Sequence, residues 1–288
     1  MAVSAAMVKE LRERTGLGMM DCKKALAEVD GDMEKAIEEL RKKSSLKAAK
    51  KSGRTTANGL LGIKVADNGS RASLVEVNIE TDFAAKNGKF IAFVSKVADE
   101  LFASADGNLE NLAAALNDER ETLVQEIGEN ITIRRGQVMQ SATGGLSHYM
   151  HGDQCRGALV ELSAGADDLG RDLAMHVVAI NPMVVNSADV SADILNKERE
   201  IYLSQAQDSG KPEDIIVKMV EGRVKKYLAE VSLLDQPFVK DGNVKVGALV
   251  KQAGVQVQSF LRYEVGEGIE VEELDFAAEV AAQLADSK

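Results

Sequence analysis

Alternating apolar residues constrain the fold of this chain more than any other feature of its sequence. Residues 61–65 alternate apolar with small or polar side chains, Asp67-Asn68-Gly69 supplies a turn, and residues 75–79 alternate again. Because successive side chains of a strand point to opposite faces of a sheet, this pattern predicts a β-hairpin. The apolar residues between 90 and 101 then recur at helical spacing, which predicts a helix directly after the hairpin.

The second half of the chain repeats this order. Alternating runs at 146–150 and 155–162 precede a helical pattern that stops before Pro182. The tetrapeptide Asp82-Phe83-Ala84-Ala85 also returns at 275–278, although chance is an open explanation for so short a match. The repeated order predicts an α+β fold whose core has two similar halves with antiparallel sheets.

The first forty residues have a helical pattern throughout and are expected to form three short helices. Ser4 is placed to cap the first helix and Asp32 to cap the third, while Gly16 ends the first. Met19 and Met20 lie at the start of the second helix, beside two glycines. They are interpreted either as contacts for a partner or as core residues, because methionine readily fills irregular gaps.

Residues 41–54 (RKKSSLKAAKKSGR) contain seven basic residues and no acidic one. Such a run is typical of a solvated linker or an exposed helix, and a nucleic-acid patch is the less favoured alternative. The chain therefore divides into a helical domain with a basic linker (1–54), a first core subdomain (55–142) and a second core subdomain (143–288).

The second subdomain is expected to include an inserted antiparallel helical hairpin at about 190–230. Two highly charged helical stretches meet there at Ser209-Gly210, and Pro212 suits the first turn of the second helix. The apolar residues predicted to form the seam between the helices are Ile201, Leu203, Ile215, Ile216, Met219, Val224 and Leu228.

Charge and composition argue against nucleic acid as a direct ligand. The net charge of −11, from 35 basic and 46 acidic residues, repels phosphate backbones, and the absence of tryptophan leaves few surfaces for stacking bases. Cys22 and Cys155 are too far apart to indicate a disulfide framework or a zinc site. No segment has the pattern of a signal peptide or a membrane span, so a cytoplasmic protein with no membrane contact is expected.

No arrangement of residues predicts covalent chemistry. The phosphate-binding motif GxxxxGK[ST] does not occur, and GLGMMD (16–21) lacks the third glycine of a dinucleotide fingerprint. His151 and Cys155 are the one potential nucleophile pair, but their proximity in sequence says little about their geometry. We therefore expect no catalytic residue, cofactor or metal, and a binding function is favoured over an enzymatic one.

Several motifs resemble those of the bacterial elongation factor Ts family. VKELRERTGLGMMDCKKAL (8–26) is similar to the amino-terminal helical domain of that family, and NIETDFAAKN (78–87) is similar to its exchange loop. Further similar segments follow in family order over nearly the whole chain: IGENITIRR (127–135), AMHVVAINP (174–182), SGKPEDI with KMVEGRVKKY (209–227), EVSLLDQPFV (230–239) and EVGEGIE (264–270).

The resemblance implies a guanine-nucleotide exchange factor for the GTPase elongation factor Tu, in complexes with one or two copies of each protein. It also implies a small ubiquitin-associated-like helical domain of three helices, followed by a two-subdomain α+β core with the inserted helical hairpin. A non-catalytic helical adaptor or scaffold is the alternative function.

Site residues follow from the resemblance by position. The exchange loop, residues Thr81, Asp82, Phe83 and Ala84, is expected to disturb the magnesium and phosphate site of the partner. By composition alone a core position is favoured for Phe83 over a wedge, and Asp82 is alternatively a helix cap together with Thr81. Ala84 stands where the family has valine, and Lys240 follows Val239 where the family often has methionine. The other expected contacts are Met19, Met20, Lys23, Ile127, Gly128, His151 and Val239.

Overall fold

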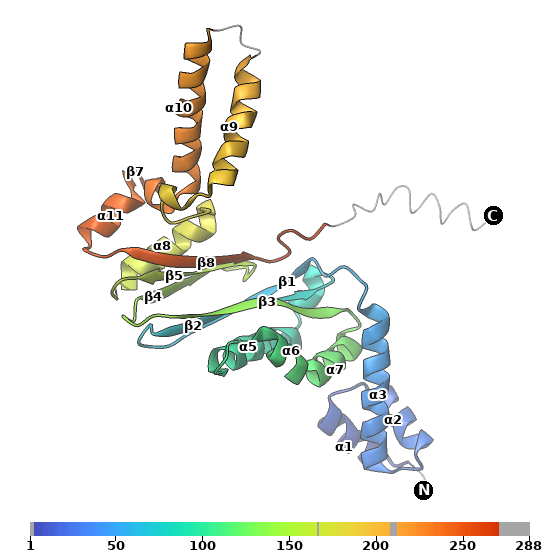
Figure 1. Ribbon diagram of the computed structural model, residues 1–288. Coiled ribbons are helices and arrows are strands. Elements are labelled where there is room, and N and C mark those ends of the chain that lie inside the picture. Colours follow the sequence, from blue (N-terminus) through green and yellow to red (C-terminus); the bar gives the residue numbers. More distant parts are fainter. Residues whose placement is uncertain (1–2, 166, 208–211, 271–288) are drawn as a thin grey trace, which may run out of the picture.

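The computed structural model describes residues 3–165, 167–207 and 212–270 of the chain (Figure 1). Three helices form the amino-terminal unit, as predicted: α1 (Ala5–Thr15), α2 (Met19–Glu28) and α3 (Met33–Lys51). The Ser4 hydroxyl accepts a hydrogen bond from the Met7 amide, and the Asp32 carboxylate accepts one from the Lys35 amide, so both predicted caps are confirmed. The residues buried in the core of this unit include Leu11, Cys22, Leu26, Ala36 and Leu40.

Helix α3 continues through most of the basic run, so of the two interpretations of this run the helix is confirmed as far as Lys51 and the linker is wrong there. Ser44 and Ala48, one helical turn apart, are buried in this segment, and α3 packs against α7 (Asn117–Ile127). Several of the basic groups have partners: Lys43 pairs with Glu28, and Lys51 donates a hydrogen bond to the Gly128 carbonyl. Charges bound in this way leave little of the run to attract phosphate, which weakens the nucleic-acid alternative.

The first sheet has the antiparallel order β1-β2-β3. It consists of β1 (Asn58–Val65), β2 (Arg71–Ile79) and β3 (Ile131–Gln140). The predicted hairpin is confirmed, and Gly69 in its turn has φ +63°, a conformation that glycine adopts without strain. Helices α5 (Gly88–Ala103), α6 (Leu109–Ala115) and α7 cover one face of the sheet (Figure 1). Phe90, Val94 and Leu101 of α5 are buried in this core.

The second sheet repeats the arrangement, with the antiparallel order β4-β5-β8. It is built from β4 (Leu146–Met150), β5 (Arg156–Leu162) and β8 (Val257–Glu264), and helix α8 (Asp167–Ile180) covers its outer face. The repeated order of hairpin and helix is thus confirmed, as is the α+β class, whereas the third strand of this sheet, β8, was not predicted. The second copy of the tetrapeptide, at 275–278, lies outside the described residues.

Seven described elements lie between α8 and β8. They are η1 (Ser187–Asp189), α9 (Ala192–Gln207), α10 (Glu213–Val231), η2 (Leu233–Asp235), β6 (Pro237–Phe238), β7 (Asp241–Lys245) and α11 (Val246–Gln252). Helices α9 and α10 lie side by side and project from the core (Figure 1). The predicted junction at Ser209-Gly210 lies outside the described part of the chain.

The seam of this hairpin was predicted only in part. Ile216 and Val224 are buried and Leu228 is partly buried, together with Leu195, Tyr202, Ala206 and Val220. Ile201, Leu203 and Ile215 are instead exposed. Apolar residues lie on more than one face of these helices, and the sequence pattern does not say which face meets the other helix.

The two sheets pack face to face, which gives four layers of helices, sheet, sheet and helix (Figure 1). Val75, Val77 and Ile79 of β2 contact the helical side of their sheet, whereas Leu74 faces the second sheet. There it packs in a cluster with Leu146, Leu159 and Tyr263 from β4, β5 and β8. Successive side chains of β2 therefore pack into two different cores, one on each face of the sheet, because both faces are covered.

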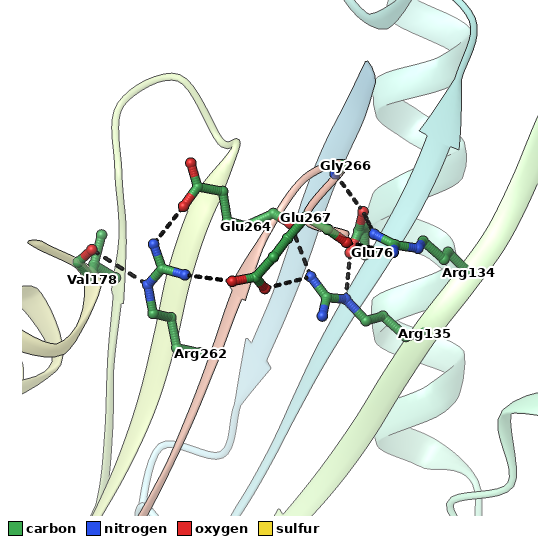
Figure 2. Close-up of polar contacts among 8 residues, drawn as sticks. All are labelled: Glu76, Arg134, Arg135, Val178, Arg262, Glu264, Gly266 and Glu267. Atoms are coloured by element: carbon green, nitrogen blue, oxygen red, sulfur yellow. Dashed lines mark hydrogen bonds and ion pairs between the residues drawn. The ribbon is translucent and has the colours of Figure 1, made fainter. Parts of the chain in front are cut away.

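A network of charged residues links the two sheets (Figure 2). Glu76 of β2 is fully buried, and its carboxylate accepts hydrogen bonds from Arg134 Nη1 (2.9 Å), Arg135 Nε (2.5 Å) and the Gly266 amide (2.8 Å). Since Gly266 follows β8, this carboxylate joins the two halves of the core. Glu267 extends the network, because it pairs with Arg135 at 3.2 Å and with Arg262 at 3.3 Å.

Candidate functional site

The exchange loop lies on a short turn of helix after β2. Helix α4 (Asp82–Ala85) has four residues, and Thr81 is its cap, since the Thr81 hydroxyl accepts a hydrogen bond from the Ala84 amide at 3.2 Å. Phe83 is 82% exposed, so the alternative that it is a core residue is wrong. Ala84 is buried and packs in the first core, so it faces inward from the same turn.

Asp82 and Lys86 flank the exposed phenylalanine. The Lys86 ammonium lies 2.8 Å from the Asp82 carboxylate and 5.4 Å from the centroid of the Phe83 ring. The hydrogen bond from Lys86 lowers the pKa of Asp82, which therefore carries its negative charge at neutral pH. An exposed aromatic ring with an ionised carboxylate beside it is suited to a partner that offers both a pocket and a cationic group.

The end of α7 lies next to this turn. Gly128 ends α7 with φ +89° and is exposed, while Ile127 is half-buried against the first core. Both oxygens of Glu129 bind the exchange loop: Oε2 accepts from the Thr81 amide at 2.9 Å, and Oε1 accepts from the Thr81 hydroxyl at 2.7 Å. The hydrogen bonds of Glu129 therefore hold two of the predicted contact points, residues 81–84 and 127–128, next to each other.

Glu80 and Asn130 strengthen this junction. The Asn130 amide donates to Glu80 Oε1 at 2.6 Å, and the Asn58 side chain donates to the Glu80 carbonyl at 2.8 Å. Sequence reasoning missed Glu80, Glu129 and Asn130 as site residues. All three lie inside the motif segments 78–87 and 127–135, so the motifs were a signal that could have found them.

The amino-terminal contact residues lie on the surface of α2. Met19 and Met20 are 57% and 68% exposed, and Lys23 is exposed one turn later, so the alternative that both methionines fill the core is wrong. Met19 and Ile127 line the same groove between this unit and the core. The Lys89 ammonium bridges the groove, since it lies 2.5 Å from Glu126 Oε1 and 3.4 Å from the Gly16 carbonyl.

The last two predicted contacts belong to the second half of the core. His151 follows β4, and its Nδ1 lies 3.3 Å from the Tyr149 hydroxyl. Val239 follows β6 and is exposed, and its amide donates a hydrogen bond to Nδ1 of the buried His176 at 3.1 Å. No described contact joins His151 or Val239 to the exchange loop, so the predicted site consists of separate surfaces.

The potential nucleophile pair is not assembled. The Cys155 thiol points to the carbonyl oxygens of Asp153 (3.4 Å) and Gly59 (3.9 Å), while the His151 ring is directed to Tyr149. Burial raises the pKa of Cys155, which disfavours the thiolate that a nucleophile needs.

Across the described ranges, no group of three or more His, Cys, Asp or Glu residues is placed to hold a metal ion. Within the same ranges, no helix combines the length and apolar character needed to cross a membrane.

This α+β protein exposes the apolar side chains of Met19, Met20, Phe83 and Val239 to solvent, a feature typical of proteins that bind other proteins. The sequence matches the family model described as elongation factor TS over residues 80–267. It is 56% identical to elongation factor Ts of Hahella chejuensis over 284 residues, covering 98% of this chain and 99% of the relative. It is 54% identical to elongation factor Ts of Saccharophagus degradans over 292 residues, covering both proteins completely.

The chain belongs to the elongation factor Ts family. The resemblance found in the motifs is thereby confirmed, and the chain is a translation elongation factor of protein biosynthesis.

Proposed function

We propose that this chain promotes the release of GDP from elongation factor Tu by binding the nucleotide-free form of that GTPase. The observation that carries the proposal is the 82% exposure of Phe83 on a capped turn that is anchored to the core. An exposed phenylalanine ring stabilises a complex when a pocket of the partner removes it from water, and this burial is worth about 1.5 to 3 kcal/mol. Phe83 is therefore assigned the role of a wedge in the partner.

The position of Asp82 suggests what the wedge disturbs. GTPases hold GDP largely through Mg²⁺ and groups around the phosphates, so displacing the elements that hold the ion loosens the nucleotide. The ionised Asp82 carboxylate enters beside Phe83, where a cationic group of the partner competes with Lys86 for it. Thr81 holds the turn, and Ala84 anchors it in the core.

One phenylalanine is not sufficient for a large effect. A 10⁴-fold acceleration requires about 5.5 kcal/mol of differential contact, which exceeds the contribution of a single buried ring. Contacts from the other surfaces are therefore part of the proposal: Met19, Met20, Lys23, Ile127, Gly128, His151 and Val239. Reciprocity then requires that GDP or GTP weaken the complex by the same factor.

The proposal assigns these surfaces to three parts of the chain. The first part, the helical domain with its basic segment (1–54), grips the GTPase through Met19, Met20 and Lys23 of α2. The first core subdomain (55–142) contributes the wedge, and the second (143–288) makes a separate contact. The helical hairpin at about 190–230 is an insertion in the last part. The chain acts in the cytoplasm without a cofactor or a catalytic residue, in complexes with one or two copies of each protein.

A labelled-GDP release assay tests the proposal. Adding this chain to elongation factor Tu loaded with fluorescent GDP is expected to accelerate release, and Phe83→Ala is expected to reduce the acceleration about 10- to 150-fold, from the loss of about 1.5 to 3 kcal/mol. Leu46→Ala is the matched control, because Leu46 is an exposed apolar residue on α3 outside the site. Equal rates with Phe83→Ala and with the unmodified chain would exclude the wedge.

A further inference from the structure

The turn that bears Phe83 is too short to be stable by itself. Helix α4 has four residues, and a single helical turn fixes several backbone dihedrals for very few hydrogen bonds. Its geometry therefore depends on groups outside the turn. The groups that contact its start are Thr81, as the cap, and Glu129, which binds Thr81 from the end of α7.

Three hydrogen bonds meet at Thr81, and the donor and acceptor of each one are fixed. A carboxylate has no proton to give, so the Thr81 hydroxyl must donate to Glu129 Oε1, at 2.7 Å. This orients the lone pairs of the hydroxyl oxygen toward the Ala84 amide, which donates to it at 3.2 Å. Glu129 Oε2 also accepts from the Thr81 amide at 2.9 Å, so the carboxylate holds both the backbone and the side chain of the cap.

The backbone next to Glu129 is also held by hydrogen bonds. Its neighbour Asn130 is buried, donates from its amide to Glu80 Oε1, and donates from its side chain to the carbonyls of Ser52 (3.4 Å) and Arg54 (3.2 Å). The segment after α3, the exchange loop and the end of α7 therefore meet around this side chain.

We propose that Glu129 is a positioning residue that holds the Phe83 turn in its helical form before any partner is bound. The carboxylate fixes the cap, the cap fixes α4, and α4 presents the ring outward. A ring held in this way avoids part of the ordering cost that a flexible loop meets on binding. The consequence for nucleotide release rests on the proposed function, whereas the order of the turn does not.

Amide hydrogen exchange of the free protein tests the positioning role directly. Glu129→Ala is expected to speed the exchange of the Ala84 and Ala85 amides at least tenfold, because local opening of the turn becomes easier. Glu119→Ala, which removes a carboxylate from α7 that pairs with Lys96, is expected to leave both amides unchanged. Unchanged protection in Glu129→Ala would overturn the inference, whatever the effect on nucleotide release.

A double-mutant cycle tests the functional consequence. Glu129→Ala is expected to lower the acceleration of GDP release about tenfold, or about 1.4 kcal/mol, and to have no further effect when Phe83 is already alanine. Glu129→Gln, which retains one acceptor oxygen, should lose less. Persistence of the full tenfold loss in the Phe83→Ala background would overturn the role, because Glu129 would then act by another route.

Thr81→Val removes the two hydrogen bonds of the hydroxyl, keeps the bond from its amide to Glu129, and serves if Glu129→Ala does not fold. Its effects are expected to have the same direction as those of Glu129→Ala and a smaller size, while Thr81→Ser, which keeps the hydroxyl, should behave as the unmodified chain. If the unmodified chain fails to accelerate GDP release but Glu129→Ala still loosens the turn, the proposed function fails and the positioning role stands.

Discussion

Replacing Glu76 with glutamine tests how strongly the two halves of the core are joined (Figure 2). Burial alone would raise the pKa of Glu76, but hydrogen bonds from the Gly266 amide and from Arg134 and Arg135 outweigh it, so the pKa is lowered. The carboxylate is therefore ionised at neutral pH. Glu76→Gln keeps the shape of the side chain, removes the charge and turns one acceptor oxygen into a donor.

The magnitude follows from the burial of the partners. Removing one partner of a fully buried ion pair costs about 3 to 5 kcal/mol. The side chains of Arg134 and Arg135 are 25% and 29% exposed, and each also binds a backbone carbonyl after or at the end of β8, at Glu267 and Glu264. Solvent and these bonds offset part of the cost, so we expect a loss of about 2 to 3 kcal/mol.

Urea denaturation at neutral pH measures this loss, and thermal unfolding should show a decrease in Tm of about 4 to 12 °C. Glu267→Gln is the control from the same network, because Glu267 is 42% exposed and its pairs should contribute about 1 kcal/mol or less. Equal losses in the two variants would refute the reasoning that the buried carboxylate joins the halves.

The same variant gives a pH prediction with a definite sign. Because the pKa of Glu76 is lower in the folded protein than in the unfolded chain, its contribution is complete above about pH 4.5 and is lost as the pH falls through the folded value. The difference in stability between the unmodified chain and Glu76→Gln should therefore narrow in acid.

Two further predictions concern the buried His176 and the exposed Met20. Burial lowers the pKa of His176, so stability should fall as the pH drops below about 6.5. In His176→Gln, Tm should therefore fall less between pH 7.5 and 5.5 than it does in the unmodified chain. Burial also lowers the pKa of His148, but His148 is present in both proteins, so its contribution cancels in the comparison. Met20→Ser should change the free energy of unfolding by less than about 0.5 kcal/mol, because Met20 is 68% exposed, and should weaken binding to nucleotide-free elongation factor Tu in a titration.

The regular elements were largely predictable because their signals are local. The alternation at 61–65 and 75–79 became β1 and β2, and the apolar residues between 90 and 101 became the buried face of α5. The basic run at 41–54 was not predictable in the same way, since an exposed helix and a linker share its composition. Its helical state depends on Ser44 and Ala48, whose small side chains are buried where α3 packs on α7.

The site was predictable as a set of segments and not as an arrangement. The motifs around Thr81 and Gly128 indicated two contact points, but nothing in their spacing said that Glu129 would bind Thr81 from 48 residues away. Composition also left both interpretations of Phe83 and of the two methionines open. An apolar residue is buried or exposed according to what the rest of the chain places against it.

By itself, the sequence determined the amino-terminal helices with their caps, the repeated order of hairpin and helix, and the family of the protein, because periodicity, capping and motifs act between residues that are near in the chain. Only the tertiary structure decided that α3 extends to Lys51, that Glu76 is buried between two sheets, and that Phe83 faces solvent. Those outcomes depend on contacts between distant segments, and the free energy of such contacts is defined only when the whole core has packed.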